Sequence, residues 1–111
     1  MSLDSLGNLY FSEYLSSPFG RVRKVSVSTG IVSTIIGTGA TGGGTSYTLN
    51  YPDGVWMNSV DTLYVSDTFN ARVLSYSVST TTTTVLISNT AGLSLPASLW
   101  GDTLGNLYIP G

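Results

Sequence analysis

The chain has 111 residues, of which 41% are hydrophobic, 11% aromatic and only 9% charged, and its formal net charge is −2 at pH 7. This apolar content suffices for one core and excludes a disordered chain, while the length excludes two ordinary domains. With only 4 basic residues, the chain does not fit nucleic-acid binding, which needs many phosphate contacts. No apolar run approaches the roughly 18 residues of a membrane-spanning helix, and no signal peptide precedes Leu3.

Three short segments of the chain share one sequence pattern. They begin at Asp4, Asn58 and Asp102, 54 and then 44 residues apart, and each runs on to a Leu-Tyr pair. A repeat of about 40–50 residues is typical of the blades of a β-propeller. Two further blocks recur in the same order: residues 21–29 align without gaps on 72–80, and residues 51–56 align on 95–100.

Short runs of β-branched and aromatic residues between turn residues predict strands throughout the repeat. In chain order, the predicted strands are 9–12, 21–27, 31–36, 52–58, 63–66, 72–78, 82–87, 96–102 and 107–109. No window places apolar residues at i, i+3, i+4 and i+7, so no helix is predicted. We therefore predict an all-β fold: a β-propeller fragment of about two four-stranded blades plus a partial third. It forms a single repeat unit over 1–111, with approximate blades at 1–37, 52–88 and 96–111.

The nearly continuous apolar character of residues 54–57 fits the inner strand of a propeller blade. Such a strand packs against neighbouring blades on both faces, so it does not alternate between apolar and polar residues. Trp56 and its repeat equivalent Trp100 are therefore predicted to lie in the core between blades.

The most distinctive motifs lie between residues 49 and 73. They read Leu-Asn-Tyr-Pro-Asp-Gly-Val-Trp, then Leu-Tyr-Val-Ser-Asp, then Thr-Phe-Asn-Ala-Arg-Val. This resembles the NHL repeat, whose units run Pro-x-Gly-Val-Ala, Gly-Asn-Leu-Tyr-Val-Ala-Asp and Asn-His-Arg-Ile. Residues 21–37 also resemble a segment of bacterial NHL arrays. The family's histidine is Ala71 here, and the turn aspartate Asp67 is replaced by Glu13 in the first blade.

The resemblance implies a propeller, and an extracellular or periplasmic location is slightly favoured for a parent protein. The absence of cysteine leaves the compartment itself undetermined. The motif from Asp67 to Asn70 has two interpretations, a cation or ligand site at the propeller mouth or an Asx-type turn. The turn is favoured, with the carboxylate accepting backbone N–H bonds and Asn70 in a left-handed conformation.

Asp4, Asn58 and Asp102 form the alternative, metal-binding set of candidates. In six-bladed lactonases and lyases of related architecture, such residues near the central channel hold catalytic Ca²⁺ or Zn²⁺, and their oxygens suit Ca²⁺. Each of the three also starts a tight turn, which is the commoner role of these residue types. Zinc is disfavoured because histidine and cysteine are absent. The glycine spacing from Gly37 to Gly42 opens no helix and predicts no phosphate site.

Two connections, residues 13–20 and 38–51, are longer than their second-blade equivalents. Family geometry places both on one face, where long loops on a rigid scaffold commonly bind ligands. Tyr14, Phe19, Tyr47 and Tyr51 are the predicted ligand-binding residues, unless the loops only pack on the blade or act as glycine linkers. No catalytic residue and no cofactor are predicted, since no histidine can serve as a general base. The predicted function is a non-catalytic scaffold that binds protein or glycan; the alternative is a metal-dependent lyase or lactonase fragment.

Two blades and a partial third cannot close a ring, so apolar blade faces would remain exposed to water at both ends. We therefore expect a homo-oligomer, with a C3 trimer favoured because three chains would supply six blades. Strand 106–109 duplicates strand 9–12 and has no assigned partner in that ring.

Overall fold

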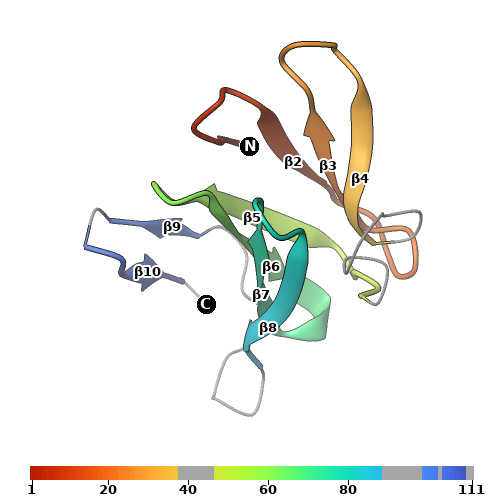
Figure 1. The fold of residues 1–111 in the computed structure, drawn as a ribbon. Helices are drawn as coiled ribbons and strands as arrows, with labels where there is room; N and C mark the ends of the chain where they lie inside the picture. Colours follow the sequence, from red (N-terminus) through yellow and green to blue (C-terminus); the bar gives the residue numbers. More distant parts are fainter. Residues whose placement is uncertain (38–46, 89–98, 103, 110–111) are drawn as a thin grey trace.

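The computed structural model of the chain describes residues 1–37, 47–88, 99–102 and 104–109, and it shows an all-β fold (Figure 1). Two four-stranded antiparallel sheets and one two-stranded sheet make up the architecture. Across the described ranges there is no α-helix, only the three-residue 3-10 turn η2 (Thr68–Asn70). None of these residues forms a helix long and apolar enough to span a membrane.

Each four-stranded sheet is a meander in which every strand pairs with the next one in sequence. The first sheet contains β1 (Ser2–Leu3), β2 (Leu9–Glu13), β3 (Arg21–Val25) and β4 (Val32–Gly37). The second contains β5 (Pro52–Met57), β6 (Thr62–Asp67), β7 (Arg72–Ser77) and β8 (Thr82–Ile87). A hairpin of β9 (Trp100–Gly101) and β10 (Leu107–Tyr108) follows. The seven predicted strands between residues 9 and 87 and the strand 107–109 are confirmed, with ends that differ by no more than two residues. Of the predicted strand 96–102, β9 covers residues 100 and 101.

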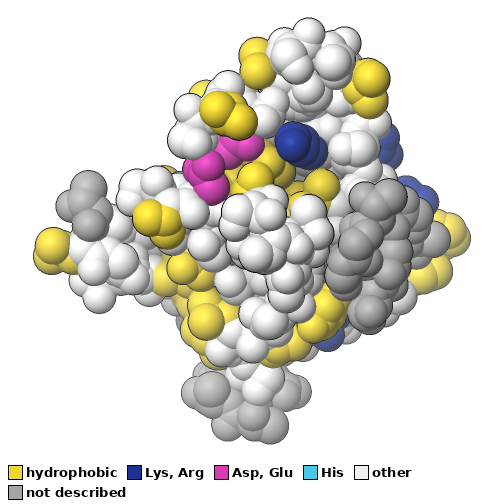
Figure 2. Space-filling view, in the orientation of Figure 1, with side chains coloured by type: hydrophobic (Ala, Val, Ile, Leu, Met, Phe, Trp, Pro, Cys, Tyr) yellow, Lys and Arg dark blue, Asp and Glu magenta, His cyan; other side chains and the backbone are white. Residues whose placement is uncertain are grey.

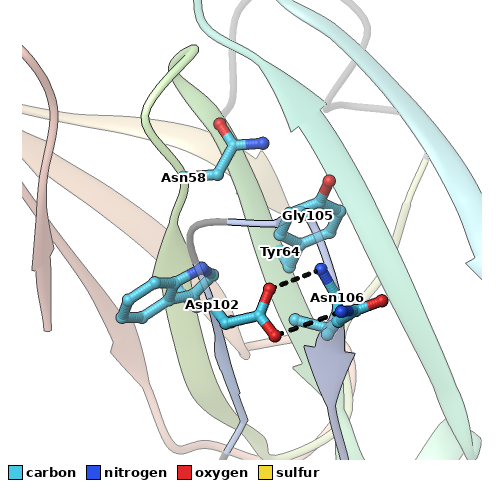
Figure 3. A pocket seen from close by; sticks show the side chains of 8 residues that line it. Asn58, Tyr64, Asp102, Gly105 and Asn106 are labelled. Carbon is cyan, nitrogen blue, oxygen red and sulfur yellow. Dashed lines mark hydrogen bonds between the residues drawn. The ribbon is translucent and has the colours of Figure 1, made fainter.

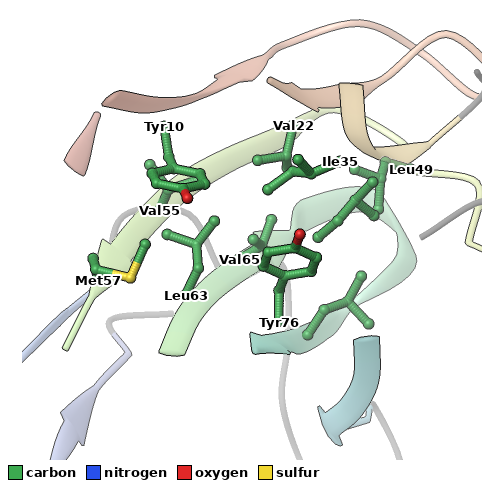
Figure 4. Packing of buried hydrophobic residues seen from close by; sticks show 11 residues of the cluster. Tyr10, Val22, Ile35, Leu49, Val55, Met57, Leu63, Val65 and Tyr76 are labelled. Carbon is green, nitrogen blue, oxygen red and sulfur yellow. The ribbon is translucent and has the colours of Figure 1, made fainter. Parts of the chain in front are cut away.

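One hydrophobic core joins the two four-stranded sheets (Figure 4). The second sheet contributes two rows of cross-strand neighbours, Val55–Val65–Leu74 and Met57–Leu63–Tyr76. The first sheet contributes chiefly Tyr10, Val22 and Ile36, all with no exposed surface. Because alternate residues of a strand point to opposite faces, one face of each sheet is committed to this core.

Among the described residues, the third repeat forms the two-stranded sheet of β9 and β10. Strand β5 contacts both β1 and β9, so the first strands of the three repeats lie in succession. Residues 96–98 of the predicted strand 96–102 lie outside the described ranges. Residues 38–46, which include most of the predicted long connection 38–51 and of the glycine motif that begins at Gly37, also lie outside them.

The prediction that Trp56 and Trp100 both lie in a core is wrong for Trp100, which is 50% exposed. Trp56 is half-buried, and the backbone of Gly101 lies directly against its indole ring. Trp100 stays open to solvent because β9 and β10 carry no further strands within the described ranges, and the ring of Tyr108 is its one ring contact there.

Candidate functional site

Three aromatic rings from separate segments meet at one end of the sheets. Tyr14 follows β2, Tyr51 precedes β5, and Phe69 lies in η2 between β6 and β7. The ring centroids of Tyr14 and Tyr51 are 4.8 Å apart at an interplanar angle of 53°, and those of Tyr51 and Phe69 are 5.0 Å apart at 71°. We call these three residues the aromatic cluster. Tyr14 is 54% and Phe69 49% exposed, so the cluster offers apolar ring surface to a ligand.

The backbone around the cluster is held by hydrogen bonds centred on Asn50. The N–H of Tyr51 donates to the carbonyl oxygen of Leu15 at 2.8 Å, and the N–H of Phe69 donates to the carbonyl oxygen of Asn50 at 3.0 Å. The side-chain Oδ1 of Asn50 accepts the N–H of Ser17 at 3.1 Å. The three segments that carry the rings are therefore tied to one another, and the rings sit on a preorganised backbone.

A buried carboxylate lies beneath this arrangement. Asp67 has no exposed surface, and its Oδ1 accepts the backbone N–H of Asn50 at 2.8 Å. Its Oδ2 accepts Nε of Arg72 at 2.7 Å and Nδ2 of Asn70 at 2.8 Å. Arg72 and Asn70 also donate to the carbonyl oxygen of Thr48, at 3.0 and 3.2 Å. A buried charge requires such pairing and hydrogen bonding, and here these bonds fix the segment that carries Tyr51.

The Asp67 carboxylate accepts a backbone N–H, as predicted, but the prediction for the motif from Asp67 to Asn70 is wrong about where this bond comes from and about which residue is left-handed. The Asp67 carboxylate makes no cap bond within its own turn but accepts the N–H of Asn50, 17 residues earlier in the chain. The left-handed residue is Ala71, with φ 50°, and not Asn70. A 3-10 turn occupies Thr68–Asn70, so the reversal into β7 falls one residue later than expected.

Tyr51 itself has φ 53°, a left-handed conformation that is uncommon for a bulky residue. Such strain costs about 1–3 kcal/mol and persists only where the surroundings enforce it, which is frequent at functional sites. Here the enforcing contacts are the hydrogen bond from the Tyr51 N–H to Leu15 and the two flanking rings.

The structure brings two of the four predicted ligand-binding residues, Tyr14 and Tyr51, into contact. Phe19 is 56% exposed, but no ring contact joins it to the cluster within the described ranges. Tyr47 packs against the hydrophobic core instead: its hydroxyl donates to the carbonyl oxygen of Thr83 at 3.1 Å. Sequence reasoning missed Phe69. Its signal was an aromatic residue inside a tight turn, on the side of the sheet where the long connections arrive.

The predicted metal-binding residues each close their own turn. Asp4 accepts the N–H groups of Leu6 and Asn8 through Oδ1, and Nδ2 of Asn8 and the hydroxyl of Tyr10 through Oδ2, at 2.9–3.1 Å. Burial raises the pKa of Asp4, but these hydrogen bonds outweigh it and the pKa is lowered. Asn58 accepts the N–H groups of Val60 and Thr62 through Oδ1.

Asp102 repeats the arrangement of Asp4 in the β9–β10 hairpin, with bonds from Leu104, Asn106 and Tyr108 at 2.8–3.1 Å. The hydrogen bonds from the backbone and side chain of Asn106 and from Tyr108 lower the pKa of Asp102 to about 2. In the part of the chain that the structure describes, no three His, Cys, Asp or Glu residues gather as a metal site would require.

A small hollow lies between the β9–β10 hairpin and the second sheet (Figure 3). It is about 20 Å³ in volume, room for about one water molecule, and is lined on one side by Trp56, Asn58 and Tyr64. Asp102 and Asn106 line the other side, joined by hydrogen bonds to each other. This hollow is too small for an organic ligand.

Calcium tests the role of these turn residues directly. Because both carboxylate oxygens of Asp4 already accept hydrogen bonds, we expect millimolar Ca²⁺ to leave the melting temperature unchanged. A ligand that binds the folded state raises the melting temperature by mass action. A rise of several degrees with Ca²⁺, absent with Mg²⁺ at equal ionic strength, would instead support the metal-dependent alternative.

No protein-family model matches this chain, and no curated protein matches it in sequence.

Proposed function

We propose that the chain is an NHL-type β-propeller module that acts as a non-catalytic binding scaffold. Two features support the propeller. The two meander sheets stack face to face around one core, and β5 lies against both β1 and β9, as successive inner strands of blades would. The surface in Figure 2 is mostly uncharged, in keeping with the 9% of charged residues, so contacts by apolar and neutral polar groups dominate recognition.

The exposed aromatic cluster is the observation that carries the binding function. Tyr and Phe rings supply large contact area at low entropic cost, and exposed aromatic residues are enriched at protein interfaces. The rings of Tyr14, Tyr51 and Phe69 are inclined at 53° and 71° to one another rather than coplanar. Inclined rings fit an apolar side chain of a peptide better than the flat face of a sugar, so a protein segment is the proposed ligand.

Binding to arrayed peptides and, in parallel, arrayed glycans tests this function. For any ligand found, we expect Phe69→Ala to weaken binding at least about tenfold, since central aromatic residues dominate interface energies. Phe19→Ala is the matched control, because Phe19 is similarly exposed at 56% but makes no ring contact with the cluster among the described residues. Equal losses in the two variants would contradict the assignment, and binding only to glycans would replace the proposed ligand class.

Self-association is the second part of the proposal. Chains that each supply two blades would associate head to tail, and such contacts close into a ring when the rotation per chain divides the circle. The resemblance to six-bladed NHL propellers favours a C3 trimer. Light scattering that gives three times the chain mass would support the ring.

A further inference from the structure

The sequence repeat shows which face of the first four-stranded sheet is equivalent to which face of the second. Leu9, Val25 and their neighbours in the first sheet align with Leu63 and Tyr76 in the second. In the second sheet these positions face the shared core. In the first sheet they lie on the opposite side from the core residue Tyr10, because successive strand residues alternate. The first sheet thus has an outer face of the same kind as the face that the second sheet buries.

This outer face carries a continuous apolar row. Leu3, Leu9, Val25 and Val32 are direct cross-strand neighbours across all four strands. Leu3 is 58% and Val32 44% exposed, and the other two are partly buried. Apolar neighbours in register across a whole sheet are typical of a face that packs against another layer.

The second sheet has the complementary outer face. Trp56 and Tyr64, which are partly buried, and Val73, which has no exposed surface, align with Ser2, Tyr10 and Val22. Tyr10 and Val22 pack in the inter-sheet core. Within one chain, the face of the first sheet that carries Tyr10 and Val22 already packs against the face of the second sheet that carries Leu63 and Tyr76. The outer face of the first sheet in one copy therefore matches the outer face of the second sheet in another, in the same relative arrangement as the observed core.

The β9–β10 hairpin covers part of the second sheet's outer face. An ideal Cβ on Gly101 would lie 2.5 Å from Nε1 of Trp56, so the hairpin backbone rests on the indole ring. The hairpin repeats β1–β2, down to the four hydrogen bonds on its aspartate. Among the described residues, however, β10 pairs only with β9, whereas β2 also pairs with β3.

The hairpin is consequently a poor substitute for a full sheet. Tyr10 in β2 is fully buried, whereas its equivalent Tyr108 in β10 is 45% exposed. The hollow of about 20 Å³ lies at the contact between the hairpin and the sheet. A four-stranded sheet would remove more apolar surface from water on the same face than two short strands do.

We infer that the β9–β10 hairpin is a displaceable cap on the second sheet, and that the first sheet of a second copy of this chain takes its place. This rests on the self-association proposed above and adds the two surfaces that meet and the segment that must move. Association is then opposed by the cap, and loosening the cap favours it.

The test measures molar mass by light scattering over a series of concentrations. Gly101→Ala places a Cβ 2.5 Å from Nε1 of Trp56 and so disturbs the contact between the hairpin and the indole ring. Asp102→Ala removes hydrogen bonds that lie within the hairpin and outside both four-stranded sheets. We expect each variant to associate at a concentration about tenfold lower than the wild type does. If the wild type and both variants reach half-association at the same concentration, the hairpin is not a displaceable cap, although self-association still stands. If all three proteins keep the mass of a single chain at every concentration, both the cap and self-association are overturned.

A second set of variants tests the surface. Leu3→Lys and Val32→Lys place a charge on the outer face of the first sheet and should keep the protein a monomer. Leu6→Lys is the matched control, since Leu6 lies in the turn of the same hairpin and is 77% exposed. If Leu3→Lys and Val32→Lys associate as readily as Leu6→Lys, the outer face of the first sheet is not the interface. Circular dichroism on each variant verifies that the sheets are intact.

Discussion

Replacing Asp67 with alanine should lower the free energy of unfolding by about 3 kcal/mol, the lower end of the cost of breaking a buried ion pair, because the Arg72 side chain is 23% exposed. Asp67 is fully buried, and its carboxylate accepts bonds from Asn50, Asn70 and Arg72. Without it, a backbone N–H and two side-chain donors lose their acceptor, and the Arg72 charge loses its partner. Urea denaturation followed by far-ultraviolet circular dichroism measures the loss.

Asp67→Asn separates the contribution of the charge to the free energy of unfolding from that of the hydrogen bonds. The amide oxygen can still accept the Asn50 N–H, but the charge pairing with Arg72 is gone, so we expect an intermediate loss. Asp53→Ala is the surface control, because Asp53 is exposed, and should change stability by no more than about 0.5 kcal/mol. A loss below about 1 kcal/mol for Asp67→Ala would show that the network does not hold the site.

The same variants report on the binding site. Asp67 fixes the backbone of Asn50, which in turn accepts the N–H of Phe69 and precedes Tyr51. Asp67→Ala removes the acceptor of the Asn50 N–H, so in the folded fraction of this variant the near-ultraviolet circular dichroism of the aromatic cluster should weaken, and Asp67→Asn should retain most of the signal.

The second large effect is expected at Asp4, where the chain contains its own matched control. Asp4 and Asp102 accept equivalent sets of hydrogen bonds within turns of nearly identical sequence, but Asp4 is 7% exposed whereas the bonds of Asp102 are exposed. Asp4→Ala leaves the buried donors of Asn8 and Tyr10 without an acceptor, which costs about 2–3 kcal/mol. Asp102→Ala should cost far less, because water replaces the lost acceptor.

The pH dependence follows from the lowered pKa of Asp4. Hydrogen bonds outweigh burial and bring this pKa below its ordinary value of 3.8, so the ionised carboxylate stabilises the fold. That stability is fully present above the ordinary value and is lost as the pH falls through the lowered one. The difference in urea midpoint between the wild type and Asp4→Asn should shrink below about pH 4. A difference that stays constant down to pH 2 would exclude this linkage.

Local features of the chain were readable from sequence because their causes are local. Each strand is a short β-branched or aromatic run bounded by turn residues, and the structure confirms the strands from β2 to β8 with small shifts at their ends. The turn at Asp4 depends on donors only two to six residues away, so its residue types predict it.

The candidate site was only partly predictable, because its contacts join distant segments. Tyr14 and Tyr51 were expected on one face, but Phe69 was not, since nothing within its own turn shows that another ring will lie 5.0 Å away. Tyr47 was expected beside them and instead packs on the core, with its hydroxyl bound to Thr83, 36 residues later.

What the sequence by itself determined is the repeat, the all-β class, the order of the strands and the aspartate turns, since periodicity and turn chemistry act over a few residues. What only the tertiary structure decided is which faces are covered. Asp67 binds Asn50 across 17 residues, and Trp100 stands half-exposed although its equivalent Trp56 is partly buried. The burial of a residue depends on the layer that packs against it, and the covered residues alone do not specify which segment forms that layer.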